Sequence, residues 1–397
     1  MPNSSTPAVI VIGAGVVGCS IAYHLARSGA RVTVFDKGGI CGGMSARSGA
    51  LIRMHYTFAP EARLAWDSLD YFANWRARVG VGDCNFVRTG FAVVVGEENA
   101  ARLAANVAML RGLGVDTTMI DCDALRRIDP AVTLDQIAAA AYEPQSGYAD
   151  PIATTQSFAD AATQHGARFQ LHREVTAINV LGDHATGVEA ISQRFDADVV
   201  CIVAGPWSDS LLAPAGVRIG LRSERAQVAF FRRHPATRHL AYIDTITGCY
   251  FRPQSDDLTL GGLGEWRSEA PPDPDRFIET NDPEFIPEVR RRIAHRIPAM
   301  ADAPYSHGHA GIYDVSPDSR AVIDAVPGVR GLFVAAGFSG TGFKTSPAVG
   351  AAMAKLILEG KGAASELAPF SFDRILSGNL IRPANEYAMG AGFGHTL

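Results

Sequence analysis

A glycine-rich motif close to the amino terminus constrains the fold more than any other feature of the chain. Residues 9–12 are apolar and lead directly into Gly13-Ala-Gly15-Val-Val-Gly18. The apolar run predicts a buried parallel strand, and the glycines allow a tight turn and a close approach of the backbone to a pyrophosphate. Residues 19–27 predict a helix whose amino end faces the phosphates. The sequence therefore predicts a dinucleotide-binding unit.

A carboxylate at the end of the next predicted strand supports this interpretation. Residues 31–36 form that strand, and Asp36 is its last residue. In a dinucleotide-binding fold, an acid at this place accepts hydrogen bonds from a ribose 2′-hydroxyl and would repel a 2′-phosphate, which disfavours NADP. A glycine-rich turn in an unrelated α/β protein is the alternative. The order of strand, glycines, helix, second strand and terminal acid favours the dinucleotide.

The composition limits the partners and the location of the protein. The chain has 397 residues, 47% of them hydrophobic and 19% charged, which is enough for a large core and two domains. The net charge of -5 creates no field that would gather nucleic acid. No apolar run is long enough to predict a membrane span. Six cysteines without a Cys-x-x-Cys pair or zinc-like clustering suit reduced thiols in a cytoplasmic protein, while the oligomeric state is open.

Helical and strand-like segments alternate along the rest of the chain. The predicted elements are helices at residues 61–79, 97–112, 151–162 and 287–297 and strands at residues 90–95, 175–180 and 197–205. Between residues 223 and 264, short alternating strands separated by turns predict an antiparallel sheet in a second domain. The basic helix at 287–297 is predicted to present a solvated face with four arginines, Arg290, Arg291, Arg292 and Arg296.

The carboxyl third of the chain favours flavin over nicotinamide. Residues 331–337 predict a buried strand, and residues 338–347 form a second glycine-rich turn that leads into a helix extending to residue 358. The amino end of a helix carries unpaired N–H groups and positive potential. Aimed at the pyrimidine edge of an isoalloxazine ring, it would stabilise the negative charge that appears on two-electron reduction. A tight turn without a ligand is the alternative.

Four motifs occur in the order seen in one known family. They are Val-Ile-Gly-Ala-Gly-Val-Val-Gly at residues 11–18, Val-Ala-Gly-Pro-Trp-Ser at 203–208, Tyr-Asp-Val-Ser-Pro-Asp-Ser at 313–319 and Ala-Gly-Phe-Ser-Gly-Thr-Gly-Phe-Lys at 336–344. On these motifs the chain resembles the D-amino-acid oxidase superfamily of FAD-dependent oxidoreductases, and within it the sarcosine oxidase and dimethylglycine dehydrogenase branch. The resemblance implies an α/β fold, with a Rossmann-like FAD-binding domain of the glutathione reductase type and an inserted α+β substrate domain that carries a mixed, largely antiparallel sheet.

The resemblance also implies how the chain is divided. The FAD-binding domain is expected to be discontinuous and to comprise residues 1–82, 148–222 and 305–375. The substrate domain is expected at residues 83–147 and 223–304. Residues 376–397 would form a carboxyl-terminal tail.

Most of the predicted site residues are cofactor contacts that the resemblance implies. It puts the first glycine turn at the pyrophosphate, Asp36 and Lys37 at the adenosine ribose, Val175 at the adenine, and the later motifs along the flavin. Monomeric sarcosine oxidases attach flavin through a cysteine two residues before the tyrosine that matches Tyr313. Gly311 stands there, so FAD is expected to bind without a covalent bond. The predicted cofactor contacts are Gly13, Gly15, Val16, Val17, Gly18, Asp36, Lys37, Ser45, Arg47, Ser48, Gly49, Val175, Ala204, Gly205, Trp207, Gly340, Thr341, Gly342, Phe343 and Lys344.

Substrate binding is assigned to fewer residues. In this branch, an arginine and a lysine that match Arg53 and Lys344 hold the substrate carboxylate, and a guanidinium paired with an ammonium suits that task. Arg53 could instead tie the cofactor loop, and Lys344 could cap a helix. Other branches of the superfamily place an arginine near Tyr313, where this chain has none. Arg252 matches a lysine that promotes reaction with oxygen, and Tyr250 is a further predicted pocket residue.

The resemblance implies oxidation of the C–N bond of a small carboxylated amine, such as sarcosine, dimethylglycine or iminodiacetate. Hydride would pass to flavin N5, and water would hydrolyse the resulting imine. Oxygen or another electron acceptor would reoxidise the cofactor. His55, His307 and His309 are possible pocket residues. A His-x-His pair at loop spacing, such as His307 and His309, is more often structural, and no third metal ligand accompanies it.

Three other functions stay open at this level. One is a D-amino acid or opine-type oxidase or dehydrogenase of the same superfamily. Another is a non-catalytic FAD-binding subunit of a heteromeric oxidase. The third, an NAD-dependent dehydrogenase, would share the first glycine motif but leave the turn at residues 338–344 unexplained.

Overall fold

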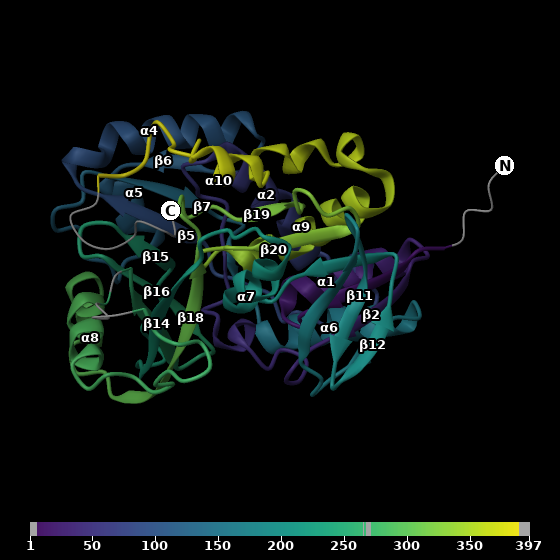
Figure 1. Cartoon of the computed structure of the whole chain (residues 1–397). Helices are drawn as coiled ribbons and strands as arrows, with labels where there is room; N and C mark the ends of the chain where they lie inside the picture. The colour runs from purple at the N-terminus through teal and green to yellow at the C-terminus, as the bar shows by residue number, and fades with distance from the viewer. Residues whose placement is uncertain (1–5, 265, 267–270, 389–397) are drawn as a thin grey trace.

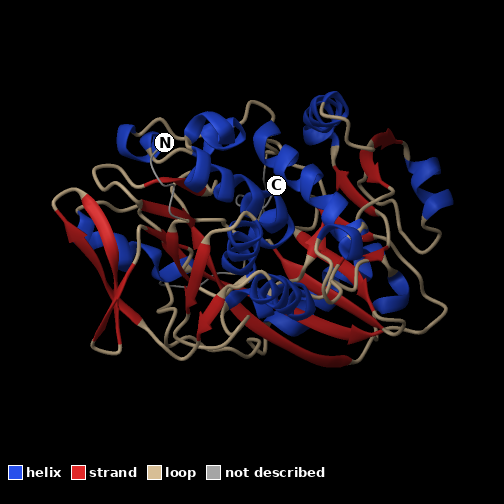
Figure 2. Cartoon of the chain, turned by 90° about the vertical axis from the view of Figure 1, so that its right-hand side faces the viewer, coloured by secondary structure: helices blue, strands red, loops and turns tan. Residues whose placement is uncertain are grey.

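Two large β-sheets organise the chain. A computed structural model describes residues 6–264, 266 and 271–388, so part of the predicted tail, residues 389–397, lies outside the described residues. Figure 1 shows strands of one sheet on the left and strands of the other towards the right, and Figure 2 shows the helices that pack around both groups of strands.

The first sheet has six strands in the order β19-β20-β13-β1-β2-β9, and all neighbours are parallel except β19 and β20. Its central strand alternates between two cores: Val9 and Val11 pack with the helices on one face, while Ile10 and Ile12 pack on the other. This double burial explains the continuous apolar run in the sequence. The strands are β1 (Ala8–Ile12), β2 (Arg31–Phe35), β9 (Arg168–Gln170), β13 (Val199–Ile202), β19 (Val322–Ala325) and β20 (Leu332–Ala336).

Helices α1 (Val16–Arg27), α6 (Pro151–Gln164) and α9 (Gly342–Glu359) pack against one another on this sheet. The cap of α6 is Asp150, whose carboxylate accepts hydrogen bonds from the N–H groups of Ile152 and Ala153. This agrees with the predicted helix start.

Helix α9 begins earlier than predicted. The sequence suggests a turn as far as Pro347, but residues from Gly342 onward are already helical. Pro347 has no N–H to donate to the carbonyl of Phe343. The hydroxyl of Ser346 donates to that carbonyl at 2.8 Å instead, so the helix tolerates the proline. Lys344 consequently lies in the first turn of the helix.

The second sheet has eight strands in the order β18-β14-β17-β16-β15-β5-β7-β6, antiparallel except for the pair of β15 and β5. The mixed sheet confirms the predicted architecture. Helices α4 (Glu97–Gly112), α5 (Cys122–Ile128) and α8 (Phe285–Arg296) pack against it. Its strands are β5 (Phe91–Val95), β6 (Thr118–Ile120), β7 (Ala139–Glu143), β14 (Arg222–Arg232), β15 (Ala241–Asp244), β16 (Cys249–Gln254), β17 (Leu258–Leu263) and β18 (Tyr305–Val315).

Strand β18 pairs with β14 along its whole length, so residues 305–315 belong to the eight-stranded sheet and not to the six-stranded one. The predicted division of the chain puts residue 305 onward in the FAD-binding part. The strand pairing favours a boundary nearer residue 316, and the division itself remains a proposal.

The structure also contains two small sheets and four further α-helices. One sheet contains β10 (Val175–Leu181), β11 (His184–Ala190) and β12 (Gln193–Asp196), and the other β3 (Leu51–Ile52), β8 (Gly147–Tyr148) and β4 (Val87–Arg88). The predicted helix at 61–79 is broken at Asn74 into α2 (Ala59–Ala73) and α3 (Trp75–Arg78). The remaining helices are α7 (Ser208–Leu212) and α10 (Asp373–Ser377).

One arginine of α8 does not follow the predicted pattern. Arg296 is fully buried, and its guanidinium donates to both carboxylate oxygens of Asp244, with Nε to Oδ2 at 2.6 Å and Nη2 to Oδ1 at 3.3 Å. Arg291 is exposed, and together with Arg292 it pairs with Glu288. The prediction of a solvated face is therefore wrong for Arg296, because a carboxylate on β15 provides it with a buried partner.

All six cysteines are free thiols. None of the helices in the described part of the chain is both long enough and apolar enough to cross a membrane.

Candidate functional site

A cavity of about 760 Å³ is lined by residues of both large sheets. Its size is within the range of small-molecule and cofactor sites. All the predicted cofactor contacts except Thr341 line this cavity. So do Arg53, Tyr250 and Arg252, the other residues predicted to act in the site. Thr341 is buried and donates its hydroxyl to the carbonyl of Phe338 at 2.7 Å, so its side chain shapes the turn and does not face the cavity.

The first glycine turn is packed too tightly for any side chain. Gly13 has φ +119°, and a Cβ atom there would lie 2.3 Å from the carbonyl oxygen of Val203. A Cβ atom at Gly18 would lie 2.0 Å from the carbonyl oxygen of Gly13. The turn brings the amino end of α1 to the cavity, where the N–H of Val16 donates to Ser45 Oγ at 3.0 Å. This geometry fits the close approach of a pyrophosphate.

The carboxylate of Asp36 is oriented by the backbone around it. Its Oδ2 accepts a hydrogen bond from the N–H of Ala14, and its Oδ1 accepts one from the N–H of Gly38, both at 2.7 Å. Each carboxylate oxygen can accept a second hydrogen bond. Asp36 also lines the cavity, so it can still accept the hydroxyl groups of a ribose.

The loop that follows β17 of the eight-stranded sheet contacts several of the predicted cofactor residues. Asp275 accepts hydrogen bonds from Lys37 Nζ at 2.5 Å and from Trp207 Nε1 at 3.0 Å. Glu279 on the same loop pairs with Arg47 at 2.7 Å. Both acids line the cavity. Sequence reasoning missed them because no local motif marks an acid whose basic partner lies more than two hundred positions away.

We expect Asp275→Asn to weaken FAD binding about two- to fivefold, since partly exposed ion pairs contribute modestly. The dissociation constant is measured from the fluorescence of free flavin after dialysis. Because salt screens this pair, added salt should weaken binding more in the unmodified protein than in the variant.

The matched control is Asp257→Asn, which removes a comparably exposed ion pair with Arg232. Asp257 lies in the turn between β16 and β17, and Arg232 is the last residue of β14. The control variant should leave FAD binding unchanged. Equal losses in the two variants would show that the loop does not hold the cofactor.

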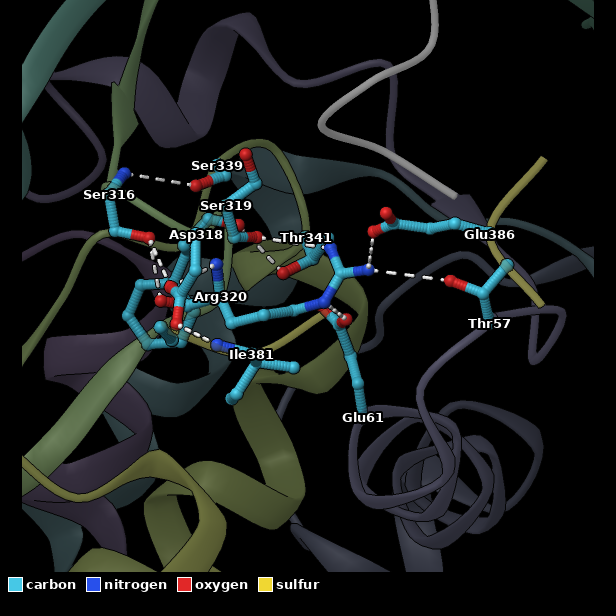
Figure 3. A network of polar contacts seen from close by, with 12 residues as sticks. Thr57, Glu61, Ser316, Asp318, Ser319, Arg320, Ser339, Thr341, Ile381 and Glu386 are labelled. Carbon is cyan, nitrogen blue, oxygen red and sulfur yellow. Dashed lines mark hydrogen bonds and ion pairs between the residues drawn. The ribbon is translucent and has the colours of Figure 1, made fainter. Parts of the chain in front are cut away.

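The second glycine turn is supported by the motif at residues 313–319. Asp314 Oδ2 accepts a hydrogen bond from the N–H of Gly337 at 2.7 Å, and the Asp314 carbonyl accepts one from the N–H of Ser339 at 3.2 Å. The N–H of Ser316 donates to Ser339 Oγ (Figure 3). Burial raises the pKa of Asp314 to about 6, and these backbone donors oppose that rise. The motif therefore positions the turn that leads into α9.

Two buried basic side chains belong to the wall of the same cavity. Arg53 and Lys344 are both buried and both line the cavity. Burial, followed by the positive charge of Arg53, lowers the pKa of Lys344 to about 7. Arg53 donates from Nη1 to the carbonyl of His55, and its guanidinium carbon lies 4.3 Å from the ring centre of Tyr56. Lys344 Nζ lies 3.5 Å from the carbonyl oxygen of Gly340. Such a pair of cations can bind an anion.

Arg252 and Tyr250 on β16 also line the cavity. Arg252 Nε donates to the carbonyl of Gly49 at 2.7 Å, and its guanidinium lies 4.1 Å from the ring centre of Tyr148. Burial lowers the pKa of Arg252 to about 10. Burial raises the pKa of Tyr250, and the neighbouring Tyr313 adds to this rise. Arg252 thus holds the loop that contains the predicted cofactor residue Gly49.

The three histidines singled out in the sequence do not line the cavity. His307 stacks on Phe230, with ring centres 4.2 Å apart, and His309 Nε2 lies 3.2 Å from the carbonyl oxygen of Arg47. His55 is fully buried beside Arg53. Across the described residues, no group of three or more His, Cys, Asp or Glu side chains could hold a metal ion.

A network of polar contacts surrounds the buried side chain of Arg320 (Figure 3). Arg320 forms ion pairs with Glu61 and Glu386, each at 3.4 Å, and donates to Thr57 Oγ1. The negative charge of Glu61 acts against the lowered pKa of Lys344. The network therefore joins three distant segments of the chain and brings one carboxylate into the electrostatic environment of the cavity.

Comparison with known proteins agrees with this fold and site. The family described as DAO, FAD dependent oxidoreductase, matches residues 8–356. The chain belongs to this family of FAD-dependent oxidoreductases, and its cofactor is FAD. The predicted family resemblance, fold class and cofactor are thereby confirmed.

Three relatives illustrate the range of the family. The chain is 27% identical to glycine oxidase of Geobacillus kaustophilus over 92% of its own length and 96% of that protein. It is 24% identical to sarcosine oxidase subunit beta of Rhodobacter capsulatus, over 98% and 92% of the two chains. Among solved structures, L-proline dehydrogenase from P. horikoshii has a TM-score of 0.87 at 26% identity, covering 95% of this chain and all of the other.

Proposed function

We propose that the protein oxidises the C–N bond of a small carboxylated amine, an N-substituted glycine such as sarcosine, dimethylglycine or iminodiacetate. The observation that carries the proposal is the pair of buried basic side chains, Arg53 and Lys344, in the wall of the cavity that the glycine turn and Asp36 also line. A planar guanidinium can hold a carboxylate with two hydrogen bonds, and an ammonium adds a point charge.

In this proposal the chain's own residues bind and orient the substrate. Arg53 and Lys344 bind the carboxylate and thereby fix the direction in which the adjacent carbon and its nitrogen point. Bound FAD supplies the two-electron acceptor for the hydride. The site favours an unprotonated amine, because a substrate ammonium would be repelled by two buried cations. Water then hydrolyses the imine product to an aldehyde and a smaller amine.

The relatives support a substrate of this class without fixing it. Their names mention glycine, sarcosine and L-proline, and each of these is an amine that carries a carboxylate. The names include both oxidases and a dehydrogenase, so oxygen or another acceptor has to be determined by experiment. The proposal also includes non-covalent attachment of FAD, because Gly311 lines the cavity where a cysteine would be needed. A cytoplasmic location, supported by six free thiols, is part of it as well.

The test is anaerobic reduction of the purified holoprotein. We expect the visible flavin band to bleach on addition of an N-substituted glycine, with sarcosine, dimethylglycine, iminodiacetate, proline and D-alanine added separately. Readmission of air then identifies the acceptor, since fast recovery of the band marks an oxidase and slow recovery a dehydrogenase. Bleaching by D-alanine alone would favour the D-amino acid alternative. A flavin band that none of these amines bleaches would sink the proposal and favour a non-catalytic FAD-binding subunit.

A further inference from the structure

The last described residues of the chain form a segment without helix or strand that connects α10 to α4. Residues 381–388, called here the carboxyl-terminal strap, leave the region of α10 and run to α4 (Figure 1). Asn99 on α4 pairs with both backbone groups of Ala388, at 2.8 and 2.9 Å. Asn106 donates to the carbonyl of Asn385 at 3.0 Å. The strap is therefore fixed to α4, a helix that packs against the eight-stranded sheet.

One side chain of the strap is buried against His55, two residues after Arg53 of the cavity wall. Tyr387 is 6% exposed, and its hydroxyl lies 2.6 Å from Nε2 of His55, which is 332 positions earlier in the chain. The two rings are nearly parallel, with an interplanar angle of 17°. Leu51 and Tyr250, which both line the cavity, pack against the cluster that contains Tyr387.

His55 connects this tyrosine to Arg53. The carbonyl of His55 accepts a hydrogen bond from Arg53 Nη1. Burial, followed by the charge of Arg53, lowers the pKa of His55 to about 3, so the ring is neutral at physiological pH. Nδ1 of the ring has no hydrogen-bond partner among the described residues. The Tyr387 hydroxyl is thus the hydrogen-bond partner of this ring in the described part of the chain, and the backbone carbonyl of the same residue accepts the hydrogen bond from Arg53.

We propose that Tyr387 is a positioning residue for the substrate carboxylate, acting through His55 on Arg53. The inference rests on the proposed function, in which Arg53 binds that carboxylate. A guanidinium whose position is fixed by its neighbours presents its N–H groups in a defined direction, which a bidentate contact requires. The strap therefore contributes to substrate affinity, although it does not line the cavity.

The test uses Tyr387→Phe, which removes the hydroxyl and keeps the ring. The ligand is methoxyacetate, in which an ether oxygen replaces the amine of sarcosine, so it binds without being oxidised. Its dissociation constant is read from the shift of the flavin absorption band in the holoprotein. We expect this constant to rise about three- to tenfold, the effect of one lost hydrogen bond. Methoxyacetamide, which lacks the carboxylate, should bind both proteins equally. In steady-state assays, KM should rise with little change in kcat.

Tyr242→Phe is the matched control. It removes another buried tyrosine hydroxyl. Tyr242 lies on β15 of the eight-stranded sheet, and its hydroxyl donates to Asp129 at 2.7 Å. The two variants should lose similar stability, but only Tyr387→Phe should lose affinity for methoxyacetate. A double-mutant cycle with His55→Ala tests the route, because Tyr387→Phe should have no further effect once the imidazole is absent.

The outcomes separate this inference from the proposed function. If the unmodified protein binds methoxyacetate and is bleached by an N-substituted glycine, but Tyr387→Phe binds methoxyacetate as tightly, the positioning role is overturned. Equal losses in Tyr242→Phe, or a further loss in the double variant, also overturn it. If the unmodified holoprotein neither binds methoxyacetate nor is bleached, the proposed function fails, and the inference fails with it.

Discussion

Arg53→Ala is expected to lower the affinity for carboxylated amines about 10- to 100-fold, the range for loss of a hydrogen-bonded charge. The guanidinium is buried, lines the cavity together with Lys344 and can bind a carboxylate with two parallel hydrogen bonds. The measurement compares KM for the best amine of the reduction assay with the dissociation constant of methoxyacetate. Both should rise together, whereas binding of FAD itself should stay intact.

The pH dependence of the same variant gives a second readout. With a pKa of about 7, Lys344 carries its charge below pH 7 and loses it as the pH rises. Methoxyacetate should therefore bind more weakly above pH 7. Arg53 lowers that pKa, so Arg53→Ala should move the loss of binding to higher pH. Kinetics and a pH profile identical to those of the unmodified protein would remove Arg53 from the site.

Arg296→Ala is expected to destabilise the protein by about 3–5 kcal/mol, because it leaves the Asp244 carboxylate buried without its cation. Asp244 is fully buried and also accepts hydrogen bonds from the N–H groups of Ile246 and Thr247, at 3.0 and 3.2 Å. These two contacts do not neutralise its charge. The free energy of unfolding, measured by urea denaturation of the holoprotein, checks this result.

Arg291→Ala on the same helix is the control for that measurement. Its side chain is 69% exposed and pairs with Glu288 at the surface. Such pairs contribute at most about 1 kcal/mol. Equal stability of the two variants would contradict a structural role for the buried pair.

The sequence predicted the site best where function depends on local backbone geometry. Gly13 and Gly18 have no room for a side chain, and this requirement is visible as a motif. Residues from all four motifs line one cavity, although the roles of the predicted site residues remain proposals. The start of α9 was predicted too late, because the sequence shows Pro347 but not the hydrogen bond by which Ser346 compensates for it.

Contacts between distant segments could not be predicted. Asp275 and Lys37 meet only because the loop beyond β17 crosses to the other sheet. Arg296 belongs to the same basic helix as the exposed Arg291, and only the position of β15 beneath it decides that it is buried. Such pairings depend on how the sheets pack together, which hydrophobic periodicity does not encode.

The order of strands in the six-stranded sheet has a consequence for synthesis of the protein on the ribosome. Strand β1 pairs with β13, which follows about 190 residues later, and β13 pairs with β20, a further 130 residues along. The walls of the cavity therefore cannot be assembled until nearly the whole chain has left the exit tunnel. Folding with so many long-range contacts is slow. A nascent chain released before residue 342 would lack the helix that begins there and lines part of the cavity. The cofactor is therefore expected to be acquired after translation.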